Sequence, residues 1–158
     1  KGAQWALAVS LLEGLDEGRR ATTISYNSAI SACEKGANWR MALALLRRMG
    51  TSALQPSTVS YNAAISACGG GERWGEALQL LRRLEHGGGP PPDAVSYDAA
   101  LLALSAASLW QEGLLLLGRK AAQGHRHDRG ALGAVVRLLA GRWAPGAPVS
   151  GAPLWCSG

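Results

Sequence analysis

The chain has 158 residues and a formal net charge of +5, from 16 Lys and Arg against 11 Asp and Glu. Hydrophobic residues make up 47% of it, which is typical of a folded protein and excludes a disordered one. The charge excess is modest, so it permits a polyanionic partner without indicating one. Because no apolar run approaches the roughly 18 residues of a membrane-spanning helix, we expect a soluble protein that has no membrane partner.

A string of eleven residues dominates the pattern of the chain. It occupies positions 23–33, returns almost unchanged at 58–68, and has a looser copy that begins at position 94. Its tyrosine recurs at 26, 61 and 97, and tryptophan recurs at 5, 39, 74, 110 and 143. Repeat lengths of about 35 residues indicate a solenoid of helical units.

Residues 1–22 predict one helix, the second helix of a partial unit. Its apolar residues fall on a single helical stripe and are Trp5, Ala8, Val9, Leu12 and Leu15. The chain begins with Lys1 and the first helix of this unit is missing. We therefore expect a fragment that was cut from a longer array.

Residues 23–57 predict the first complete unit, which holds two helices. Thr23 or Ser25 can cap the first helix, and Gly36 is expected to close it. Asn38 is expected to cap the second helix, and Pro56 to stop it. The apolar stripes are Tyr26, Ala29, Ile30 and Cys33 in the first helix, then Trp39, Ala42, Leu43, Leu46 and Met49 in the second.

Residues 58–93 repeat this pattern position by position, and residues 94–128 repeat it less regularly. We expect a degenerate helix at 129–142 and a flexible tail at 143–158, where Ala, Pro, Gly and Ser prevail. In each unit the two helices should pack on one another, with the large Trp side chains buried between them. Cys33 and Cys68 occupy matching apolar positions, so we expect core residues there rather than a disulfide or a zinc site.

Three motifs carry a family resemblance. The units have V/I-S-Y-N near the start, A-L-x-L-L-x-x-M/L late in the second helix, and P-S or P-D at the junction. Residues 23–128 thereby resemble pentatricopeptide repeats. Tetratricopeptide repeats differ, because their pattern W-x-x-L-G-x-x-Y lies in the first helix. The resemblance implies an all-α fold, a right-handed α-solenoid of stacked antiparallel helix pairs.

The resemblance also implies selective binding of single-stranded RNA, with one base read by each repeat. In this family the base is read by the polar residue after the tyrosine and by the last residue of the unit. An aliphatic residue three places before that polar residue stacks on the base. Carried over to this sequence, the RNA-binding residues are Ile24, Asn27 and Ser57, then Val59, Asn62 and Asp93, and finally Val95, Asp98 and Asp128.

By the same resemblance, Asn with Ser favours cytosine and Asn with Asp favours uracil, so the first two units would read C and then U. Asp98 departs from this pattern, because a carboxylate only accepts hydrogen bonds and would sit with Asp128. We therefore expect weak reading in the third unit. Asn27 and Asn62 also have a simpler interpretation, since Asn readily bonds nearby backbone in caps and turns.

The sequence predicts a binding protein rather than an enzyme, with no catalytic residue, cofactor or metal. The segment 125–128, His-Arg-His-Asp, is a weak metal motif because it lacks a third ligand at a suitable spacing. The resemblance implies organellar RNA processing, editing, stability or translation, in a chloroplast or mitochondrion, with further proteins of an RNA-processing complex as partners. The alternative is a helical scaffold for protein–protein interaction.

Overall fold

The computed structural model describes residues 3–18, 20–125, 133, 136 and 140. This part of the chain contains seven α-helices and no strand. The expected helix at 129–142 and tail at 143–158 otherwise lie outside the described residues. The helices are α1 (Ala3–Glu17), α2 (Thr23–Lys35), α3 (Trp39–Thr51), α4 (Thr58–Gly70), α5 (Trp74–Glu85), α6 (Ala94–Ala106) and α7 (Trp110–Ala122).

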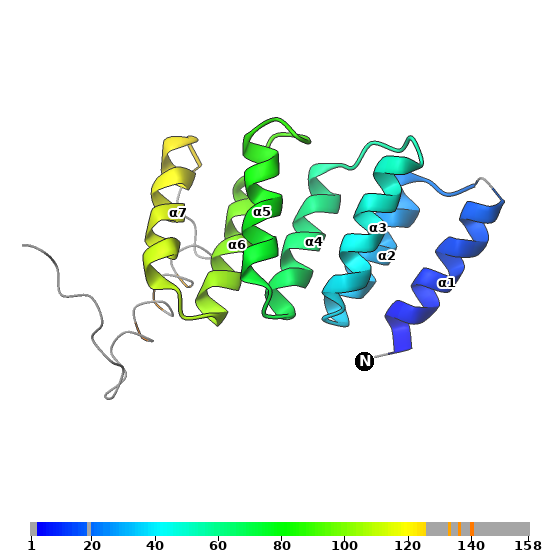
Figure 1. Ribbon diagram of the computed structural model, residues 1–158, viewed down its shortest axis with the longest axis horizontal. Helices are drawn as coiled ribbons and strands as arrows, with labels where there is room; N and C mark the ends of the chain where they lie inside the picture. Colours follow the sequence, from blue (N-terminus) through cyan, green and yellow to red (C-terminus); the bar gives the residue numbers. More distant parts are fainter. Residues whose placement is uncertain (1–2, 19, 126–132, 134–135, 137–139, 141–158) are drawn as a thin grey trace, which may run out of the picture.

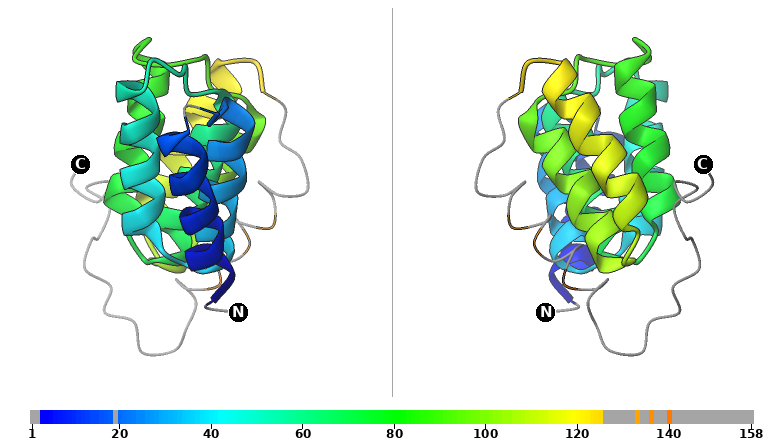
Figure 2. Two further views of the ribbon diagram at one scale, coloured as in Figure 1. Left: turned by 90° about the vertical axis from the view of Figure 1, so that its right-hand side faces the viewer. Right: turned by 90° about the vertical axis from the view of Figure 1, so that its left-hand side faces the viewer.

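The helices form two layers that run along the molecule (Figure 1). The first layer contains α2, α4 and α6, in which α2 contacts α4 and α4 contacts α6. The second layer contains α3, α5 and α7, which pack on the first layer but make no close backbone contact with one another. Figure 2 shows the two layers from the ends of the molecule. The prediction of an all-α solenoid of helix pairs is confirmed.

Small side chains allow the close approach within the first layer. Gly69 of α4 lies so close to α6 that an added Cβ would be 3.2 Å from the Cβ of Ala103. These helices are therefore buried on two sides, whereas the sequence pattern predicted one apolar stripe. The additional buried residues are Ser60, Ala63 and Ala67 in α4, and Ser96, Ala99 and Ala103 in α6.

Both cysteines of the described region are core residues, as predicted. Cys33 and Cys68 are fully buried and free. Burial raises the pKa of Cys68 to about 11, with a further increase from Glu76 and an opposing effect of Arg73. The thiol therefore stays protonated at neutral pH and behaves as a small apolar side chain.

Helix α2 begins one residue earlier than an N-cap at Thr23 would place it. Thr22, rather than Thr23 or Ser25, is the N-cap of α2, and its hydroxyl accepts from the N–H of Ser25. Ser25 reciprocates, because its hydroxyl accepts a hydrogen bond from the N–H of Thr22. The same reciprocal pair forms at the start of α4 and α6. The expected cap of α3 is confirmed, since Asn38 Oδ1 accepts from the N–H of Met41.

The turn after α2 shows that glycine is not needed there for its backbone freedom. Gly36 follows the last residue of α2 but has an ordinary φ of −89°. The left-handed residue is Ala37, with φ 52°, and Glu72 and Ser108 take the same conformation in the later turns. Gly36 thus has another role, which its neighbour across the unit boundary reveals.

Each of the first two turns uses its glycine to make room for a tryptophan of the preceding unit. A Cβ on Gly36 would lie 2.6 Å from Cδ1 of Trp5, and a Cβ on Gly71 would overlap Cδ1 of Trp39. The ring of Trp39 also lies beneath the guanidinium groups of Arg40 and Arg73, at 5.1 and 4.7 Å from the ring centroid. These contacts join successive units at the edge of the solenoid.

The turn of the third unit lacks this arrangement. The prediction that the tryptophan side chains are buried is wrong for Trp74. Ala107 stands where the earlier units have glycine, and the matching tryptophan, Trp74, is 40% exposed. An alanine methyl group would occupy the space that the indole fills in the earlier units, which explains the exposure. The size of the residue in the turn therefore decides how far the tryptophan is buried.

We predict that Gly71→Ala lowers the free energy of unfolding by about 1–3 kcal/mol, because the new methyl group overlaps Trp39. Gly118→Ala is the matched control, since Gly118 lies in α7 with open space around its Cα. The control should instead raise stability by about 0.5–1 kcal/mol, as expected for alanine in a helix. Urea denaturation measures both, and equal effects would contradict the proposed contact.

Candidate functional site

A groove of about 480 Å³ runs across α2, α4 and α6 on the free face of the first layer. Six of the nine residues that the sequence pointed to line this groove: Asn27, Val59, Asn62, Asp93, Val95 and Asp98. Ile24 shares an adjacent hollow of about 490 Å³ with Asn27 and Lys35. Ser57 bonds Asn27 from the start of α4. Asp128 lies outside the described residues.

Three aliphatic side chains of this face are unusually exposed. Ile24, Val59 and Val95 are exposed by 77%, 62% and 57%. Each stands one helical turn before the polar residue of its own unit, so both residue types share one face. Val59 and Val95 therefore bring apolar surface from neighbouring helices into the groove that contains Asn62. This arrangement offers apolar contact to a flat ligand.

Asn27 links the first unit to the second through its side chain. Its Nδ2–H donates to Ser57 Oγ at 3.3 Å, and Ser60 Oγ–H donates to its Oδ1 at 2.5 Å. Both partners belong to the start of α4, 30 and 33 residues further along the chain. The Asn27 side chain thus bridges two units. The simpler interpretation, in which it bonds nearby backbone, does not describe these contacts.

Asn62 repeats this link between the second and third units, with an acid as partner. Its Nδ2–H donates to Asp93 Oδ1 at 3.0 Å, and Ser96 Oγ–H donates to its Oδ1 at 2.6 Å. Because a carboxylate only accepts, Asp93 fixes which end of the amide faces it. The hydroxyl of Ser57 can donate or accept, so it does not fix which end of the Asn27 amide faces it.

Asp93 is ionised in this network. Burial would raise its pKa, but hydrogen bonds from the N–H of Ser96, the amide of Asn62 and the hydroxyl of Ser96 together outweigh burial and hold the pKa below its usual value. Asp93 is also the N-cap of α6, where a negative charge is favoured by the helix dipole. One carboxylate therefore starts a helix and orients the amide of the preceding unit.

Sequence reasoning missed Ser60 and Ser96. Both are fully buried, and each bonds the N-cap of its own helix and the Asn of the preceding unit. The signal was present, because serine recurs at 25, 60 and 96, three places after each N-cap. It was not recognised because the usual capping box has Glu or Gln at this place.

Asp98 has a different partner from the two asparagines. Its Oδ1 accepts from Lys120 Nζ at 2.6 Å, and Lys120 is fully buried in α7 of the same unit. The matching residues of the earlier units are Met49 and Leu84. Acid and lysine therefore replace an amide and an apolar residue together. The sequence pattern did not indicate this ion pair, in which Lys120 is fully buried and Asp98 is partly exposed.

Acidic residues, not basic ones, predominate in the groove. Glu34 lines it beside Asp93 and Asp98, and accepts a hydrogen bond from Ser66 Oγ at 2.7 Å. Lys35 lies in the adjacent hollow. Two pairs of adjacent arginines, at 47–48 and 82–83, lie on α3 and α5 in the second layer. The groove therefore offers polar edges and aliphatic surface rather than a track of cations.

The weak metal motif is only partly described. The ring of His125 lies 5.6 Å from that of Tyr97 between centroids. Burial and the hydrogen bond to Glu85 raise the pKa of Tyr97 to about 12. Positions 126–128 are outside the described residues, and the remainder of the chain that is described holds no group of three or more His, Cys, Asp or Glu suited to a metal ion. None of the described helices has the length and hydropathy of a membrane span.

The repeat motif identifies the family. The model for the PPR repeat matches residues 24–52 and 59–88, which correspond to the pairs α2 with α3 and α4 with α5. These units are pentatricopeptide repeats. The chain has no match among curated proteins.

Solved structures share the architecture of this chain. Nuclear proteinaceous RNase P 2 from A. thaliana has a TM-score of 0.73 at 14% identity, over 87% of this chain and 32% of that one. PPR10 in complex with an 18-nt psaJ RNA element has a TM-score of 0.69 at 21% identity, over 78% of this chain and 18% of that one. PPR10 from maize has a TM-score of 0.66 at 21% identity, over 94% of this chain and 23% of that one. The likeness concerns the fold, and the chain spans less than a third of each of these proteins.

We predict that Asp98→Asn and Lys120→Met are each destabilising by about 3 kcal/mol, because each removes one partner of an ion pair in which Lys120 is fully buried. The double variant restores the residue types of the first repeat and should lie within about 1 kcal/mol of the parent protein. Urea denaturation of all four proteins at neutral pH gives the coupling energy. Losses that simply add in the double variant would contradict a functional ion pair.

Proposed function

We propose that this chain binds single-stranded RNA selectively, with one base per repeat, through the groove of the first layer. The observation that carries the proposal is the grouping of Asn62 and Asp93 with the exposed Val59 and Val95 in one groove. A base that enters here meets aliphatic surface on its faces and hydrogen-bonding groups at its edge. Stacking supplies affinity for any base, and the edge supplies selectivity.

The Asn–Asp pair favours uracil on chemical grounds as well as by family. An amide has two N–H groups, and Asn62 uses one of them on Asp93. The other can donate to a carbonyl oxygen of uracil, while the oxygens of Asn62 and Asp93 can accept from its N3–H. At Asn27 the partner is the hydroxyl of Ser57, which suits cytosine by the same family rule. The preferred pair is therefore C followed by U.

The proposed repeats are residues 23–57, 58–93 and 94–128, preceded by a partial unit at 1–22. Within this division Ile24, Asn27 and Ser57 act together, as do Val59, Asn62 and Asp93. Val95, Asp98 and Asp128 form the third set, in which Lys120 already takes an oxygen of Asp98. The third repeat should therefore select bases weakly.

We place this activity in organellar RNA processing, editing, stability or translation, within a chloroplast or mitochondrion. Support comes from the repeat family and from the likeness to PPR10, which was solved with an RNA element. The role is one of binding, with catalysis left to other parts or partners of an RNA-processing complex. The alternative, a helical scaffold for protein–protein interaction, predicts no preference among RNA sequences.

The test is fluorescence anisotropy with a short labelled RNA that contains CU in a purine background. We expect Asn62→Ala to weaken binding by about tenfold, equivalent to the loss of roughly one or two hydrogen bonds. Gln111→Ala, an exposed change on α7, should leave binding unchanged. Equal binding of an all-purine RNA, together with no effect of Asn62→Ala, would contradict the proposal and favour the scaffold.

Exchange of the unit-end residue gives a sharper test of selectivity. Asp93→Ser should shift the preference at the second base from U towards C, because it installs the pair found at Asn27 and Ser57. Ser is also a good N-cap, so α6 should keep its start. Ser57→Asp should produce the reverse shift at the first base. Competition among CC, CU, UC and UU oligonucleotides measures both, and an unchanged order of preference would count against base reading.

A further inference from the structure

We propose that a cleft in the second layer, between α3 and α5, binds an acidic peptide segment of a protein partner. The cleft has a volume of about 1000 Å³ and lies on the side of the solenoid opposite the groove. Tyr61 faces the cleft, while the next residue, Asn62, lines the groove. The two surfaces therefore use different residues, and this proposal does not depend on RNA binding.

The cleft exists because α3 and α5 do not meet, so α4 forms the floor between them. The connection after α5 also lines the cleft, and there Tyr61 Oη–H donates to the carbonyl of Gly88 at 3.4 Å. A Cβ on Gly89 would lie 3.1 Å from the ring of Tyr61, so glycine lets this connection rest on the ring. The apolar part of the lining is Leu43, Leu46, Leu54, Pro56, Leu80 and Pro90.

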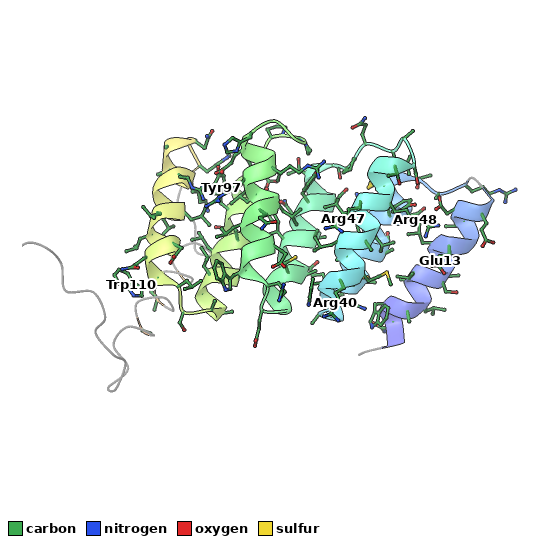
Figure 3. The ribbon with its side chains drawn as sticks, in the orientation of Figure 1. Glu13, Arg40, Arg47, Arg48, Tyr97 and Trp110 are labelled. Carbon is green, nitrogen blue, oxygen red and sulfur yellow. The ribbon has the colours of Figure 1, made fainter. Side chains whose placement is uncertain are left out.

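Two arginines give the cleft its charge. Arg47 and Arg48 leave α3 on opposite sides (Figure 3), and Arg48 pairs with Asp16 at 2.6 Å, whereas Arg47 lines the cleft. Arg83 lines the other wall, and its Nε–H donates to the carbonyl of Gly88 at 3.1 Å. Neither Arg47 nor Arg83 has a carboxylate partner among the described residues.

The other charged side chain of the lining does not cancel these arginines. Glu76 lies in the wall of the cleft but is paired with Arg73 at 2.6 Å. The fork of N–H donors on a guanidinium matches the two oxygens of a carboxylate. A wall with an arginine on each side and leucines between them fits a segment that alternates carboxylates with apolar side chains. We therefore infer charge complementarity to an acidic, leucine-containing peptide.

Nucleic acid fits this cleft less well than a peptide. Its described lining contains one aromatic residue, Tyr61, and that side chain is buried, so bases have no exposed ring on which to stack. Leucine and proline surface instead favours aliphatic side chains of a partner. Two arginines could still hold phosphates, and the experiment includes RNA for this reason.

The probe is a short fluorescein-labelled peptide of alternating Glu and Leu, measured by anisotropy with the whole chain. We expect it to bind the parent protein, and the same peptide with Gln in place of Glu to bind at least about tenfold more weakly. The double variant Arg47→Glu with Arg83→Glu should lose about as much affinity. Arg82→Glu is the matched control, because Arg82 neighbours Arg83 but lies outside the cleft, and it should change affinity by less than about twofold.

Three results would overturn the proposal. They are the absence of peptide binding, an equal loss per charge in Arg82→Glu, and arginine variants that weaken a CU-containing RNA but leave the peptide unaffected. Circular dichroism confirms that each variant is folded. Asn62→Ala separates this site from the groove, since it should weaken RNA binding and leave peptide binding unchanged. A failure of one proposal therefore remains distinguishable from a failure of the other.

Discussion

The hydrogen-bonded link between an asparagine in one unit and the N-cap of the next is the constraint on which the rest of this structure depends. At the second boundary, Asp93 caps α6, accepts from Asn62 and is held by Ser96. The cap is thereby fixed by the neighbouring unit as well as by its own helix. The link sets the register of two units and the direction of the amide at once. Asp93 is thus both a candidate site residue and a packing residue.

The contrast between the two layers explains where the two hollows lie. Small residues such as Gly69 and Ala103 let the first-layer helices touch, so their free faces form one continuous surface. The second-layer helices carry large leucines and arginines and remain apart, so a cleft opens between α3 and α5. Close packing on one side and separation on the other follow from side-chain volume in a stack of identical pairs. The acidic groove and the arginine-lined cleft differ in charge because each layer repeats its own residue types.

Much of this fold could be predicted from the sequence, because the period, the apolar stripes and the Asn38 cap are local signals. The choice of Asn27, Val59, Asn62 and Val95 came instead from the family resemblance, and these four residues line one groove. The errors concern contacts between units. The role of Gly36 depends on Trp5, which lies 31 positions earlier, and no local rule connects them. Ser96 likewise looked like an ordinary helix residue, since its second partner belongs to the preceding unit.

The third unit shows how such contacts between units change together. Its Ala107 removes the space for Trp74, and its Asp98 takes Lys120 of its own helix pair as partner. In the first two units the corresponding asparagine takes partners from the next unit. A buried lysine requires a nearby acid, so substitution of Asn by Asp at 98 is tied to the replacement of Met or Leu by Lys at 120. The chemistry of the polar position in the groove is thus set by the core residue behind it, and an aligned pair of positions, 98 and 120, carries more information than either residue alone.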